Sequence, residues 1–92
     1  MSTYIYSQWI STPAGYPKEF YSELDPNRYE TRKVEIFADG KMTYASTQKS
    51  IAPTRLGIAP VPTLAEIRSQ TEFAVREITK QDFEKVWIEA IK

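Results

Sequence analysis

Residues 28–45 constrain the fold of this chain more than any other segment, because they contain the pattern of a β-hairpin with Gly40 at its turn. A three-residue loop with Gly40 in the left-handed conformation collects the apolar side chains on one face of the hairpin, whereas a two-residue loop would scatter them over both faces. We therefore predict the three-residue register. The cross-strand pairs that it sets opposite one another are Ile36 with Met42 and Val34 with Tyr44.

Two strands are predicted ahead of the hairpin. Residues 3–10 are rich in aromatic and β-branched side chains, and apolar groups on both of their faces indicate a strand that is covered on both sides. Residues 11–17 contain two prolines and a glycine, which is loop chemistry. Residues 19–24 form the second strand, and Asp25, Pro26 and Asn27 then supply a turn before the hairpin begins.

Residues 47–62 have no periodic pattern and carry three prolines and a glycine. We expect an ordered loop, because it contains four apolar side chains that could hold it against the core: Ile51, Leu56, Ile58 and Val61. Loops of this length in small domains are often functional, although a covering strap that closes one end of the core is the alternative interpretation. Arg55 is a charged residue inside it and therefore a candidate site residue.

Two helices are predicted in the last third of the chain. Thr63 and Glu66 form a capping box that begins a short helix ending near residue 70. Thr79 and Asp82 have the same spacing at the start of the C-terminal helix. An apolar stripe at helical period follows and predicts that this helix packs on the sheet; its members are Phe83, Val86, Trp87, Ala90 and Ile91.

These elements predict one α+β domain over residues 1–92. We expect an antiparallel sheet of about four strands, with the C-terminal amphipathic helix and the short helix packed on one face, because the strands precede the helices. A chain of 92 residues with 41% hydrophobic and 26% charged residues matches a globular protein with one core.

Composition narrows the possible functions. The chain contains neither His nor Cys, so disulfides, thiolate metal sites and the commonest general base are all missing. We predict no cofactor and assign no catalytic residue or metal ligand. The N-terminal segment has no signal-peptide pattern and no stretch is apolar enough to span a membrane, so we expect a soluble, cytoplasmic protein. Twelve basic residues balance twelve acidic ones, which disfavours nucleic acid and anionic membranes as partners.

Four carboxylates in the predicted strands and turn leave an enzymatic alternative open. They could hold a divalent cation through oxygen ligands, as in a metal-dependent hydrolase or nuclease; they are Glu23, Asp25, Glu30 and Glu35. The competing interpretation is a solvated or mutually paired charged face, because basic residues alternate with these acids. Arg32 lies at the end of the apolar stripe of the hairpin, so it either extends to solvent or is held by a carboxylate.

Binding of a protein partner fits the remaining features best. Exposed Tyr and Arg side chains on rigid strands are typical of protein interfaces. The candidate binding residues are Trp9, Tyr21, Glu23, Arg28, Tyr29, Glu30, Arg32 and Arg55. Each could instead form an internal ion pair or pack in the core. A second alternative is binding of single-stranded nucleic acid on the aromatic first strand. A free edge strand would allow a homodimer, so we leave monomer and homodimer both open.

The chain resembles a family of small, uncharacterised bacterial proteins. The residues that carry the resemblance are Tyr21-Ser-Glu-Leu-Asp25, Arg28-Tyr-Glu30, Arg32 to Phe37, Asp39-Gly40, Tyr44-Ala45, Thr54-Arg-Leu-Gly57, Pro60, Pro62, Glu77-Ile-Thr79, Asp82-Phe-Glu84 and Trp87. The resemblance implies a stand-alone bacterial cytoplasmic domain with no established activity. Small proteins of this kind often resemble immunity proteins, so by analogy the partner is a toxin domain that the chain neutralises.

Overall fold

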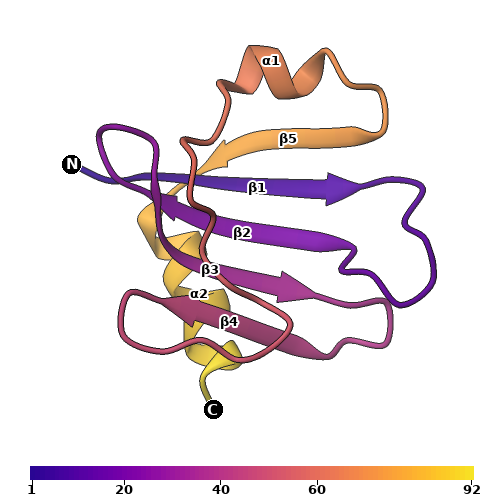
Figure 1. Ribbon diagram of the computed structural model, residues 1–92, viewed down its shortest axis with the longest axis vertical. Coiled ribbons are helices and arrows are strands. Elements are labelled where there is room, and N and C mark those ends of the chain that lie inside the picture. Colours follow the sequence, from indigo (N-terminus) through magenta and orange to yellow (C-terminus); the bar gives the residue numbers. More distant parts are fainter.

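The computed structural model describes residues 1–92 as one five-stranded antiparallel sheet with two helices (Figure 1). The elements are β1 (Thr3–Trp9), β2 (Glu19–Leu24), β3 (Glu30–Ile36), β4 (Met42–Ser46), α1 (Leu64–Arg68), β5 (Phe73–Ile78) and α2 (Lys80–Ala90). The strand order across the sheet is β4-β3-β2-β1-β5. The predicted α+β class is confirmed, with five strands where about four were expected.

The additional strand is β5, which lies between the two helices in the sequence and pairs antiparallel with β1. Its register sets Tyr4 opposite Ile78 and Trp9 opposite Phe73. Because β2 pairs with the other side of β1, the first strand is internal to the sheet. Both faces of β1 are also covered, because Tyr4 packs against Phe83 of α2 on one face and Ile5 lies near Val61 and Ile67 on the other.

The hairpin of β3 and β4 has the predicted three-residue register. Ile36 pairs with Met42 and Val34 pairs with Tyr44. Gly40 adopts a φ of +88°, which a residue with a side chain rarely adopts. Its N–H donates to the carbonyl of Phe37 at 2.9 Å and so closes the turn.

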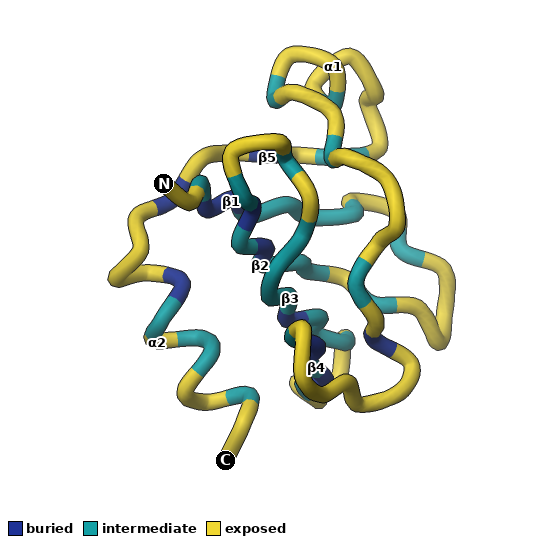
Figure 2. Tube along the Cα trace, turned by 60° about the vertical axis from the view of Figure 1, so that its left-hand side comes forward, coloured by how far each residue is buried: buried dark blue, intermediate teal, exposed yellow.

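The helix α2 covers one face of the sheet, which we call the helix side. Both predicted capping boxes are present, and the one at Thr79 and Asp82 begins α2. Phe83 is fully buried against Tyr4 and Ile78, while Trp87 packs partly buried beside them. Figure 2 shows most of the buried residues on the strands of the sheet, with α1 exposed along most of its length. Neither α1 nor α2 has the length and apolar character that a membrane-spanning helix requires.

Residues 47–62, which we call the strap, cross the opposite face, the strap side, on their way to α1 (Figure 1). The expected apolar anchoring is wrong for Ile58, because 98% of its surface is exposed. Ile51 is exposed as well, whereas Leu56 and Val61 are half-buried as expected. Polar contacts add to the attachment of the strap, and the most buried is that of Thr54 with Thr43 and Glu35. The short helix α1 contacts β5, and its Ile67 lies on the strap side rather than on the face covered by α2.

Candidate functional site

Arg32 lies at the centre of an ion network between β2, β3 and α2. Its guanidinium group donates to both carboxylate oxygens of Glu23, at 2.8 and 2.7 Å, and to both of Glu84, at 3.0 and 2.7 Å. The hydroxyl of Tyr4 also donates to Glu23, at 3.0 Å. The plane of the guanidinium covers the rings of Phe83 and Trp87, with its central carbon 4.8 and 5.1 Å from their centroids. Two of the candidate binding residues, Glu23 and Arg32, therefore join the sheet to α2.

The network shifts the acidities of its members. Hydrogen bonds from Arg32 lower the pKa of Glu23 to about 2, against an ordinary value of 4.5. The same cation lowers the pKa of Glu84, and hydrogen bonding to Glu23 and Glu84 raises the pKa of Arg32. Burial, together with the hydrogen bond to Glu23, raises the pKa of Tyr4. Both carboxylates are therefore ionised at neutral pH, and their charge is used inside the chain.

Acidification should reveal this network. Glu23 binds a proton near pH 4.5 in the unfolded chain but only near pH 2 in the folded one. Its stabilising contribution is therefore complete above pH 4.5 and is lost as the pH falls toward 2. We expect the free energy of unfolding, measured by urea denaturation, to decrease across this window. The Glu23→Gln variant should lose stability at neutral pH and show a shallower decrease; an unchanged slope would contradict this assignment.

Arg28 and Glu30 hold the strap. Arg28 has a φ of +67° and donates from Nε to the carbonyl of Val61 at 2.8 Å and from Nη2 to that of Pro62 at 2.7 Å. Glu30 accepts from the backbone N–H of Gly57 at 2.6 Å and pairs with Lys33 at 3.0 Å. Since these contacts attach both side chains to the strap, Arg28 and Glu30 also act within the chain.

Tyr21, another candidate, lies on the helix side. Its ring packs against that of Tyr6, with 4.9 Å between the centroids, and both rings contact the core. Burial raises the pKa of Tyr21. The side chain is half-buried and therefore contributes mainly to the packing under α2.

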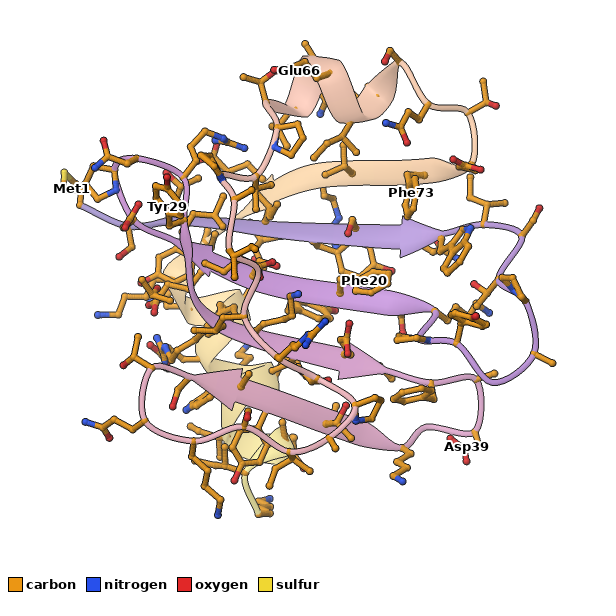
Figure 3. The ribbon with its side chains drawn as sticks, viewed as in Figure 1. Met1, Phe20, Tyr29, Asp39, Glu66 and Phe73 are labelled. Atoms are coloured by element: carbon orange, nitrogen blue, oxygen red, sulfur yellow. The ribbon has the colours of Figure 1, made fainter.

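Three candidates remain accessible, and their polar groups are free of partners within the chain. Trp9 is half-buried at the end of β1, Tyr29 is exposed at the turn before β3, and Arg55 is exposed on the strap. Figure 3 places Tyr29 at one end of the sheet and Phe73, the neighbour of Trp9, toward the other. The eight candidates therefore do not assemble into one site.

Aromatic side chains outside the predicted set of candidates extend the surface around Trp9. Trp9 stacks on Phe73 with 5.8 Å between centroids and meets Tyr16 edge-on at 5.7 Å. Phe20 of β2 lies on the strap side as well, with β1 between it and Phe73, and both rings line one cleft (Figure 3). We call these four residues, Trp9, Tyr16, Phe20 and Phe73, the aromatic surface. The signal that could have revealed it is the Phe73-x-Val75 alternation, which indicates a strand with Phe73 at its end.

A cleft of about 550 Å³ adjoins the aromatic surface between the β1–β2 loop and the β3–β4 turn. We call it the loop cleft. Ile10, Tyr16 and Phe37 give it a largely apolar lining, to which the strap adds Pro53. Two lysines, Lys18 and Lys41, and one acidic residue, Asp39, also line it, and none of the three is in an ion pair. The loop cleft is thus largely apolar, with two unpaired basic side chains and one unpaired acidic side chain in its lining.

The four carboxylates of the metal hypothesis are separated. Glu23 lies on the helix side, whereas Glu30 and Glu35 bond to the strap, and Asp25 accepts N–H groups of its own turn. No group of three or more acidic, His or Cys side chains is placed to hold a metal ion. The geometry on which that hypothesis depended is therefore not present.

Comparison with known proteins assigns a family without an activity. Neither the curated proteins nor the solved structures give a match to this chain. The model of one family, described as a domain of unknown function, matches residues 3–92 and thus nearly the whole chain. The membership in a family of unknown function that the sequence motifs predicted is confirmed by this match. The chain belongs to the DUF6881 family, a domain of unknown function.

Proposed function

We propose that this chain is a protein-binding module and that the aromatic surface and the loop cleft receive its partner. The observation that carries the proposal is the stacked group of Trp9, Phe73 and Tyr16 at the end of the sheet that neither α2 nor the strap covers. Aromatic residues are enriched in protein interfaces because they bury large areas with few rotatable bonds.

The loop cleft supports the same conclusion. Ile10 and Tyr16 are more than half exposed beside it, and contiguous apolar surface of this kind is uncommon on a small domain without a partner. The free ammonium groups of Lys18 and Lys41 would pair with carboxylates at the rim of the interface. The partner surface that fits is an apolar projection flanked by acidic side chains.

The narrower form of the proposal is that the partner is a toxin domain, which the chain neutralises as an immunity-type protein in the bacterial cytoplasm. This form is supported by the analogy with small immunity proteins. It predicts that co-expression of the chain restores growth of cells that produce the toxin.

The test is affinity capture of the tagged chain from its native host, followed by titration calorimetry with the purified partner. We expect the double variant Ile10→Ser/Tyr16→Ser to weaken binding at least about tenfold, because it removes two apolar side chains from the interface. Both residues are exposed, so the folded state should tolerate the change.

The matched control is Ile88→Ser/Ile91→Ser, which removes two exposed apolar side chains, one from α2 and one from the residue that caps its C-terminal end. This variant should bind as the unaltered chain does. Equal losses in both double variants, or no stoichiometric protein retained from the host, would contradict the proposal. Reversing the charge of Arg28 or Arg32 is unsuitable as a binding test, because both side chains hold the fold together.

A further inference from the structure

A second, smaller cleft of about 260 Å³ lies on the strap side of the sheet, and we call it the sheet cleft. Its floor is formed by β1 and β2, and Phe73 of β5 lines one wall. Val61 of the strap and Ile67 of α1 lie over it. The sheet cleft is shallow and open to solvent, and Phe20 and Phe73 belong to both this cleft and the aromatic surface.

Two serines create the cleft. The strand register sets Ser7 between Val75 and Phe20, and Ser22 between Ile5 and Lys33. Each serine is therefore a small side chain surrounded by larger ones on the same face of the sheet. The missing volume at these two positions leaves a hollow that the strap and α1 only partly cover.

The hydroxyl groups of these serines are available for a ligand. Ser22 is 6% exposed and lines the cleft, yet its hydroxyl makes no hydrogen bond with another group of the chain. Every fully buried side-chain polar atom of the protein has a partner, so the Ser22 hydroxyl is accessible from the cleft. The hydroxyl of Ser7 is equally unpaired and lies on the neighbouring strand. A ligand that fills the cleft excludes water from these hydroxyl groups, so a ligand that supplies hydrogen-bond partners for them is favoured over one that does not.

The two charged residues that line the sheet cleft, Lys33 and Glu30, form an ion pair with each other. Lys33 lies 3.0 Å from a carboxylate oxygen of Glu30 and donates to the backbone carbonyl of Arg55 at 3.2 Å. The same oxygen of Glu30 accepts the N–H of Gly57. No unpaired charge therefore remains for an ionic ligand, and the cleft suits a group that is neutral, mainly apolar and capable of hydrogen bonding.

We propose that the sheet cleft takes a tyrosine side chain of the protein partner. This inference rests on the proposed function and specifies the anchor that the partner inserts. The ring lies against Phe20 and Phe73, and the phenol hydroxyl exchanges hydrogen bonds with Ser22 and Ser7, since it both donates and accepts. The volume is smaller than that of most small-molecule sites, which fits one anchoring side chain supported by a surrounding interface.

Nuclear magnetic resonance can test the cleft without the partner. The probes are N-acetyl-tyrosinamide and N-acetyl-phenylalaninamide, which differ by one hydroxyl group. We expect the tyrosine amide to shift the backbone resonances of Ser7, Phe20, Ser22 and Phe73 saturably. The phenylalanine amide should bind about fivefold more weakly, because it lacks one hydrogen bond. Equal affinities, no saturable shift, or shifts confined to other residues would each overturn the inference.

Two variants distinguish the contribution of the serine hydroxyl groups to binding from that of the empty volume of the sheet cleft. Ser22→Ala keeps the space and should reduce the preference for the tyrosine amide, whereas Ser7→Leu fills the hollow and should abolish binding of both probes. Ser11→Ala, in the exposed turn after β1, is the matched control and should bind as the unaltered chain does. If Ser22→Ala does not fold, the difference in affinity between the two probes for the unaltered chain is the test of the proposed hydrogen bonds. Failure of the probes would overturn the tyrosine anchor alone, because the proposed function is tested separately at Ile10 and Tyr16.

Discussion

Replacing Arg32 with methionine should lower the free energy of unfolding by about 3–5 kcal/mol. The guanidinium group is bonded to both Glu23 and Glu84, and the side chains of Arg32 and Glu23 are only 20% and 13% exposed. Methionine keeps much of the apolar volume against Phe83 and Trp87 but leaves two neighbouring carboxylates without their cation. The loss should therefore come mainly from uncompensated charge rather than from packing.

Urea denaturation of a small set of variants can identify that cause. Arg76→Met is the matched control, because Arg76 is exposed, lies over the ring of Tyr6 at 4.9 Å and is in no ion pair. Arg76→Met should lower the free energy of unfolding by less than about 1 kcal/mol. The double variant Glu23→Gln/Arg32→Met should recover part of the loss, since it removes one of the stranded charges. Equal stabilities of Arg32→Met and Arg76→Met would contradict the role of the network.

Replacing Phe83 with alanine should lower the free energy of unfolding by a similar amount, about 3–5 kcal/mol. Phe83 is the buried residue of α2 and has 0% of its surface exposed. Its ring lies 5.4 Å from that of Tyr4 and 6.2 Å from that of Trp87, centroid to centroid. Alanine would remove these contacts and leave a cavity between the helix and the sheet.

Amide hydrogen exchange locates the damage, because α2 should lose protection in Phe83→Ala to a greater extent than the paired strands do. Ile88→Ala is the matched control on the same helix, since Ile88 is exposed, and it should change stability by less than about 1 kcal/mol. A comparable loss in both variants would contradict the role of the buried phenylalanine ring in the stability of α2.

Local patterns in the sequence predicted much of the architecture. The glycine turn and the apolar alternation around it specified the register of β3 and β4, because a shift of one residue would expose every core side chain of the hairpin. The capping boxes at Thr63 and Thr79 marked where both helices begin, because the groups that satisfy each other there are only three residues apart. These features depend on neighbours in the chain.

The prediction missed β5 because its partner is distant in sequence. The segment 73–78 is short and contains both apolar and polar residues. It forms a strand because it pairs with β1, some seventy residues earlier in the sequence. The aromatic surface was missed for the same reason, since Phe73 reaches Trp9 only through this pairing.

The roles of the candidate residues also depend on contacts between segments that are distant in the sequence. The sequence by itself determined the class of fold, the hairpin register, the helix starts and the supply of charged and aromatic side chains. Only the tertiary structure decided that Glu23 and Arg32 hold α2, that Arg28 and Glu30 hold the strap, and that Trp9 remains accessible. The physical reason is that an ion pair and an interface use the same residue types, and the distance to a partner from another element determines which of the two forms.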